Sequence, residues 1–129
     1  MTRSVLTVDL KDDPAVIAAY KEHHRRVWPE VLSSLRAVGI RHMDIYILER
    51  RLVMIAETSD GLDIRRCFAA HVSSHPRVAE WETLMKSMQE PPPGSESGEW
   101  WVAMEPLFQL DGAQDASTAA NTRDRRRTR

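Results

Sequence analysis

Hydrophobic residues recur along the chain at two spacings, one typical of strands and one typical of helices. Val5–Leu10 alternates and is rich in valine and threonine, so it predicts a strand. Arg41–Leu48 and Leu52–Thr58 predict two more strands. Only residues 49–51 separate this pair, which indicates a hairpin, and the absence of an Asn-Gly pair leaves its turn type open.

Helical spacing of apolar residues fills the segments between and after these strands. Asp13 and Pro14 are typical of a helix start, because an acidic residue caps free N–H groups and proline suits the first helical position. Pro29 interrupts the first helix directly after Trp28, and Gly39 ends the next one. The expected helices run from Pro14 to Pro29, from Val31 to Gly39, from Leu62 to Val72 and from Pro76 to about Met88.

The end of the chain's apolar pattern completes the fold prediction. A Pro/Gly/Ser loop, Glu90–Gly98, precedes an expected strand over Glu99–Leu110, in which the adjacent Trp100 and Trp101 would face opposite sides. The order β-α-β-β-α-β predicts an α+β, ferredoxin-like fold of the dimeric α/β-barrel type. Helices would cover one face of this sheet, so we expect a second copy of the chain to cover the other, in a homodimer.

Composition and charge define the working unit and exclude several classes of partner. The chain has 129 residues, enough for one domain, and 42% of them are hydrophobic. Residues 111–129 hold five arginines and three aspartates and lack large apolar side chains, so we expect a disordered basic tail after a domain over residues 1–110. The domain is mildly acidic, which argues against nucleic acid as a partner, and no apolar run could span a membrane. The single cysteine, Cys67, excludes an intramolecular disulfide and predicts a reduced, cytoplasmic protein.

One helix carries the densest group of chemically useful side chains. Tyr20 and His24 lie four residues apart and share a helix face, and histidine is the side chain that titrates near neutral pH. The pair suits acid/base chemistry. From spacing alone, a core histidine bonded to a tyrosine is the commoner arrangement. The tandem His23 and His24 project about 100° apart and would not share one ion, so we expect no metal and no cofactor.

Aromatic side chains supply candidate binding surfaces. The set comprises Trp28, Tyr46, Trp81, Trp100 and Trp101. An indole face suits the C–H face of a pyranose, although tryptophans at helical spacing are more often part of a core. Tyr46 lies on the polar face of its strand, which is either solvent-exposed or part of a site.

The order of these residues resembles a known family, the L-rhamnose mutarotases. The resemblance rests on Tyr20-xxx-His24-xxx-Trp28-Pro29-Glu30, Gly39-Ile40, Ile45-Tyr46, Pro76-xxxx-Trp81 and Phe108-x-Leu110, and it covers residues 4–110. It implies a dimeric ferredoxin-like isomerase that interconverts the α and β anomers of 6-deoxy-L-hexoses. It also implies that His24 is the acid/base residue, with Tyr20 beside it at the sugar.

Two departures from the rhamnose pattern favour the family's L-fucose branch. Trp81-Glu82 stands where paired tryptophans are usual, and Gln89–Pro93 replaces an asparagine-rich loop. A carboxylate in place of an indole adds an acceptor for a sugar hydroxyl. We therefore expect an L-fucose mutarotase (aldose 1-epimerase) of carbohydrate metabolism, with Tyr46, Trp81, Glu82 and Trp101 binding the sugar.

Two other functions fit the same expected architecture. Haem-degrading and cofactor-free monooxygenases share it, and in them His24 would be a haem ligand or a proton relay. A non-catalytic dimeric interaction module would use Tyr20 and His24 only as core.

Overall fold

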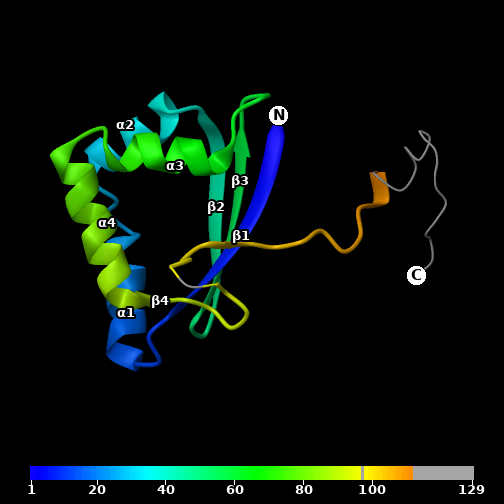
Figure 1. Ribbon diagram of the computed structural model, residues 1–129. Helices are drawn as coiled ribbons and strands as arrows, with labels where there is room; N and C mark the ends of the chain where they lie inside the picture. The colour runs from blue at the N-terminus through cyan, green and yellow to red at the C-terminus, as the bar shows by residue number, and fades with distance from the viewer. Residues whose placement is uncertain (97, 112–129) are drawn as a thin grey trace.

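Three long antiparallel strands form the centre of the sheet in the computed structural model, which describes residues 1–96 and 98–111. They are β1 (Thr2–Leu10), β2 (Ile40–Leu48) and β3 (Arg51–Thr58). All three confirm the predicted strands, with β1 beginning three residues earlier than expected. The strand order β2-β3-β1-β4 places β3 between the two strands that precede it in the chain, as a ferredoxin-like fold requires (Figure 1).

Four helices connect the strands, and local capping explains where they begin. They are α1 (Pro14–His23), α2 (Pro29–Ala37), α3 (Ile64–Val72) and α4 (Pro76–Met88). The carboxylates of Asp13 and Asp63 accept hydrogen bonds from the first turns of α1 and α3. The first helix ends at His23, sooner than expected, and Pro29 holds Trp28 in an extended conformation, with ψ at 139°, where α2 begins.

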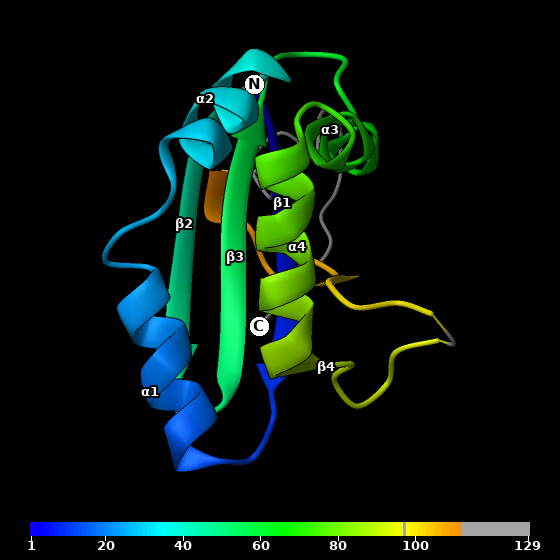
Figure 2. The ribbon, with the colours of Figure 1, turned by 90° about the vertical axis from the view of Figure 1, so that its left-hand side faces the viewer.

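All four helices cover one face of the sheet (Figures 1 and 2). The side chains of Leu6, Val8 and Leu10 on β1 point to this face and are fully buried. The alternate residues of β3, from Leu52 to Thr58, are buried on the same face. This alternation concentrates the core between sheet and helices, as the spacing of apolar residues in the sequence predicts.

The prediction of a long last strand is wrong. Glu99–Leu110 contains only the short strand β5 (Val102–Ala103), while β4 (Gln89–Glu90) follows α4 directly. Both pieces pair with the same edge of β1. The edge is interrupted because the prolines at 91–93 have no N–H to donate to a ladder, and Pro106 sets the same limit after β5.

We expected the two adjacent tryptophans to face opposite sides of a strand. They do not, because both precede β5. Trp100 and Trp101 are both half-buried and both pack against the core on the helical side of the molecule. The backbone oxygen of Trp101 accepts a hydrogen bond from the Arg65 guanidinium at 2.9 Å, which ties this segment to α3.

The second face of the sheet is left uncovered by α1 to α4 (Figure 1). Cross-strand neighbours on this face include Val5 with Ile55 and Val53 with Tyr46, so its centre is apolar. The segment after β5 extends away from the sheet on this side, where Leu107 and Phe108 are exposed. The expected tail beyond residue 111 lies outside the described residues. Within them, no helix is long and apolar enough to cross a membrane.

The core predicts different costs for the same substitution at two leucines. Leu52 is 1% exposed, whereas Leu62 is 40% exposed. Leu52→Ala should lower the free energy of unfolding by about 2–5 kcal/mol because it leaves a cavity. Leu62→Ala should cost less than half as much. Urea denaturation measures both values, and equal costs would contradict this account of the core.

Candidate active site

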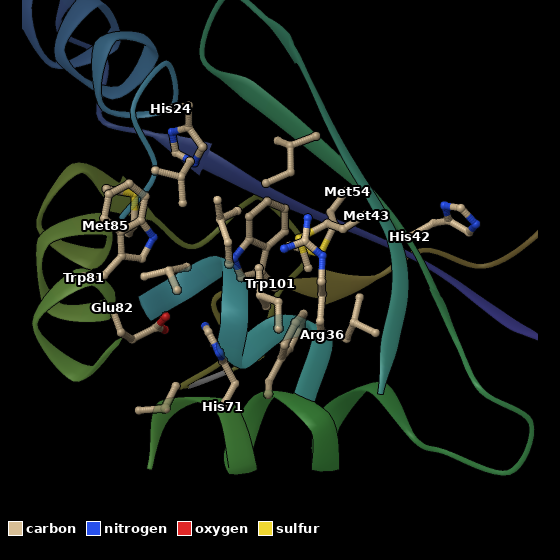
Figure 3. Close-up of a pocket in the computed structure, with 18 of the residues that line it drawn as sticks. His24, Arg36, His42, Met43, Met54, His71, Trp81, Glu82, Met85 and Trp101 are labelled. Carbon is tan, nitrogen blue, oxygen red and sulfur yellow. The ribbon is translucent and has the colours of Figure 1, made fainter. Parts of the chain in front are cut away.

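A cavity of about 490 Å³ lies between the helices and the covered face of the sheet. Its volume falls within the range of small-molecule sites. Side chains from α1, α2, β2, α3 and α4 line it, together with Trp101 from the segment before β5 (Figure 3). Most of the lining is apolar, and a few histidine, tyrosine, arginine and carboxylate groups are placed within it.

Tyr20 is a buried phenol held in one orientation by α4's end. Its side chain is 4% exposed, and the Gln89 amide donates a hydrogen bond to its hydroxyl oxygen at 3.0 Å. Burial raises the pKa of Tyr20 to about 12; the hydrogen bond from Gln89 acts in the opposite direction, and the nearby Glu82 carboxylate adds to the increase. The phenol is therefore protonated at neutral pH, and its hydroxyl hydrogen is not used by Gln89.

His24 lies directly beside this phenol, with 4.4 Å between the ring centroids. Its Nδ1 is 2.9 Å from the backbone oxygen of Tyr20. Because a carbonyl oxygen only accepts, Nδ1 carries the hydrogen and Nε2 keeps its lone pair in the neutral ring. Burial lowers the pKa of His24, an effect that the bond to the Tyr20 carbonyl opposes and the neighbouring His23 reinforces. The site thus holds a neutral imidazole next to a neutral phenol.

Trp81 on α4 fixes the position of these groups from the other side. Its ring centroid lies 5.6 Å from that of His24 and 5.2 Å from that of Trp28, both at an interplanar angle of 69°. The Arg77 guanidinium carbon lies 3.8 Å from the centre of the Trp28 ring, which closes the outer side of the cluster. Trp81 is 6% exposed and belongs both to the core and to the cavity wall.

Two other predicted residues also line the cavity. Glu82 points its carboxylate from α4 into the cavity (Figure 3), and the Lys86 ammonium lies 3.8 Å from that carboxylate. Trp101 lines the cavity, whereas Trp100 does not. Of the predicted site residues, the structure therefore brings together Tyr20, His24, Trp81, Glu82 and Trp101.

Tyr46 is not brought to this cavity. Its side chain is 61% exposed and belongs to the uncovered face of the sheet, because it pairs across the strands with Val53 rather than with a core residue. The side of its strand on which the sequence places Tyr46 therefore belongs to the face that α1 to α4 leave uncovered.

Sequence reasoning missed several cavity residues, among them Arg36, Met43 and His71. Met43 lies on the inward side of its predicted strand, so its place could have been inferred. His71 follows Ile64 and Cys67 at spacings of three and four, and all three are buried on one face of α3. That spacing was the available signal for His71.

Comparisons with known proteins identify the family. The family model described as L-rhamnose mutarotase matches residues 3–110. The chain belongs to this family. It is therefore a sugar mutarotase, and mutarotases are isomerases.

Two curated relatives and one solved structure illustrate the family's range. An L-fucose mutarotase of Xanthomonas campestris pv. campestris is 39% identical over 115 residues, which cover 88% of this chain and 91% of the relative. An L-rhamnose mutarotase of Shouchella clausii is 25% identical over 71% of this chain and 67% of its own. The crystal structure of L-rhamnose mutarotase FA22100 from Formosa agariphila superposes with a TM-score of 0.61 at 20% identity. It covers 85% of this chain and 99% of that one. This structural match confirms the fold.

The buried histidines predict how the stability of this mutarotase depends on pH. Burial lowers the pKa of both His24 and His71 below the value of about 6.5 that they have when unfolded. As the pH falls, the unfolded chain therefore takes up protons that the folded chain does not. The free energy of unfolding should be highest above pH about 6.5, and it should decrease as the pH falls from there through the lowered pKa values of the folded protein. Denaturant unfolding across this range should show that decrease. A His24→Asn/His71→Asn double variant should show a smaller decrease. If the variant and the wild type had the same pH dependence, these two histidines would not be its cause.

Proposed function

We propose that this enzyme interconverts the α and β anomers of a 6-deoxy-L-hexose at the Tyr20–His24 end of the cavity, with L-fucose preferred over L-rhamnose. The observation that carries the proposal is the pairing of a neutral imidazole with a protonated phenol in direct ring contact, where the Nε2 of that imidazole has no hydrogen-bond partner among the described residues. Mutarotation requires one group that removes the proton of the anomeric hydroxyl and another that delivers a proton to the ring oxygen.

His24 is suited to the first role. Its Nε2 accepts the proton of the anomeric hydroxyl while the bond between C1 and the ring oxygen breaks, which leaves an aldehyde at C1. The resulting imidazolium is stabilised by the hydrogen bond from Nδ1 to the Tyr20 carbonyl. A lowered pKa keeps the base form available at neutral pH.

Tyr20 is suited to the second role. The ring oxygen becomes more basic as its bond to C1 breaks, and it takes the proton of the phenol. The Gln89 amide, which donates to the phenol oxygen, stabilises the phenolate that remains. Rotation about the C1–C2 bond then presents the other face of the aldehyde. Ring closure reverses both transfers, so His24 and Tyr20 recover their starting states.

The walls of the cavity support a sugar as substrate. The Trp81 indole offers an apolar surface for the C–H groups of a pyranose. The Glu82 carboxylate, one residue further along α4, can only accept hydrogen bonds when ionised and so favours hydroxyl donors. The preference for L-fucose rests on this carboxylate and on the similarity to the Xanthomonas relative.

We further propose that the enzyme works as a homodimer joined through the uncovered face of the sheet. An apolar sheet centre that includes Val5, Val53 and Ile55 would otherwise face water. The extended segment with exposed Leu107 and Phe108 leaves on this same side and would reach the partner. Tyr46 would then lie in the dimer contact. The single cysteine supports a reducing cytoplasmic location.

Anomer exchange measured by saturation-difference NMR on L-fucose, L-rhamnose and D-ribose tests the catalytic proposal. We expect the protein to accelerate exchange of both 6-deoxy sugars, L-fucose more. His24→Ala should lose about 100-fold or more of the activity, because an acid/base group contributes on this scale. His23→Ala is the matched control, since His23 is the adjacent histidine and does not line the cavity.

Three results would contradict this proposal in different ways. If the protein accelerates anomer exchange of none of the three sugars, the proposed activity is overturned. Faster exchange of L-rhamnose than of L-fucose would overturn the preference. Full activity in His24→Ala, or an equal loss in His23→Ala, would overturn the assignment of the base.

Sedimentation velocity tests the dimer. Val53→Glu places a charge at the centre of the uncovered face and should convert a dimer into a monomer, because a charge without a partner is costly to bury. Leu62→Glu, at a 40% exposed position away from that face, should remain dimeric. A monomeric wild-type protein, or a Val53→Glu variant that stays dimeric, would overturn this interface.

A further inference from the structure

The cavity contains a second buried histidine that the proposed proton transfers do not use. His71 on α3 is 6% exposed and lines the cavity at the end away from His24 (Figure 3). In the same view its ring and the Glu82 carboxylate point toward one another. The two ends of the cavity therefore each present an imidazole, in different surroundings.

A chain of three hydrogen bonds fixes which nitrogen of His71 carries the hydrogen. The Ser74 hydroxyl donates to the backbone oxygen of His71 at 2.7 Å, which uses its only hydrogen. Ser74 must therefore accept from the Ser34 hydroxyl, whose oxygen lies 2.7 Å away. Ser34 in turn must accept from His71, whose Nδ1 lies 2.8 Å from its oxygen. The neutral ring thus carries its hydrogen on Nδ1, and Nε2 is a hydrogen-bond acceptor.

This acceptor has no partner among the described residues. The hydrogen bonds found for the His71 side chain there involve Nδ1 alone, although the residue is almost fully buried. Buried polar atoms in native proteins are normally hydrogen-bonded, and one without a partner within the chain is a candidate contact for a ligand. Burial lowers the pKa of His71, so the ring remains neutral and Nε2 keeps its lone pair at neutral pH.

The Glu82 carboxylate, which also lies close enough to raise the pKa of Tyr20, is a second acceptor in the cavity wall. Two acceptors that line one cavity select a ligand edge that carries donors, and a pair of adjacent sugar hydroxyls is such an edge. The substrate of the proposed function offers this edge. When its anomeric carbon lies at His24, C4 lies on the opposite side of the pyranose ring and points to the other end of the cavity.

We propose that His71 Nε2 and the Glu82 carboxylate together accept hydrogen bonds from the C3 and C4 hydroxyls of the sugar, so that His71 selects the configuration at C4. This inference rests on the proposed function and deepens it. L-Fucose and L-rhamnose differ in configuration at C2 and C4, so an acceptor placed for the C4 hydroxyl of one sugar is misplaced for that of the other.

Kinetics on substrate and protein variants together test this role. In His71→Asn the amide nitrogen can still donate to Ser34 from the place of Nδ1, while the Nε2 acceptor is lost. We expect the KM for L-fucose to rise about five- to tenfold, with kcat within about twofold, since one hydrogen bond is removed away from the reacting atoms. The values for L-rhamnose should change little, so the preference between the sugars should shrink.

Two controls separate this effect from a structural one. His75→Asn makes the same substitution at an exposed cap of α4, where asparagine also caps well, and should leave both sugars unaffected. In the wild type, 4-deoxy-L-fucose should have a higher KM than L-fucose. In His71→Asn, the two sugars should have equal KM values. An unchanged sugar preference in His71→Asn, or an equal loss for both sugars, would overturn the proposal.

A measurement on the unaltered protein tests the proposal without any variant. Nitrogen-15 NMR of the histidine rings should show His71 as the Nδ1–H tautomer, with the Nε2 signal moving when L-fucose is added to saturation. An Nε2–H tautomer, or an Nε2 signal that does not move, would overturn the inference. If L-fucose exchanges anomers in the same sample, the failure concerns His71 alone, and if no sugar exchanges, the proposed function itself fails.

Discussion

The packing of Trp81 against one face of the α1 region is the contact on which the site depends. Tyr20, His24 and Trp28 follow one another at intervals of four, and the Trp81 ring lies within 5.6 Å of the last two, centre to centre. This contact joins the first helical segment to the last helix of the domain. It fixes the ring of His24, whose Nδ1 is held by the Tyr20 carbonyl, and it closes the cavity wall. The same packing therefore builds the core and places His24, the base of the proposed reaction.

The sequence predicts the parts of the molecule in which local pattern and tertiary contact agree. The helix that begins at Pro76, the strand alternation around Leu52, and the shared face of Tyr20 and His24 all follow from spacing and capping. The long last strand was predicted wrongly. Prolines at its margins remove the N–H donors that a strand needs for pairing, and the spacing of apolar residues does not reveal that loss. Tyr46 was misplaced for a related reason: alternation separates the two faces of a strand but does not say which one the cavity uses.

The cavity combines an apolar wall with two imidazoles held in defined tautomers. A backbone carbonyl orients His24 and a pair of serine hydroxyls orients His71, so in both rings Nε2 is the acceptor. The arrangement at His71 is not visible in the sequence, because Ser34 on α2 meets His71 and Ser74, which lie at the end of α3 and just after it, only when α2 and α3 pack together. The reaction proposed for this site needs a sugar-sized cavity and proton-transfer groups, which a domain of about this size provides.

A crystal structure of the protein with L-fucose bound would test the central claim most directly, because that claim concerns which end of the sugar meets which end of the cavity. We predict that the anomeric carbon lies at His24 and Tyr20, with the C3 and C4 hydroxyls toward Glu82 and His71. A sugar bound in this cavity with its anomeric carbon away from His24, or bound outside the cavity, would contradict the account.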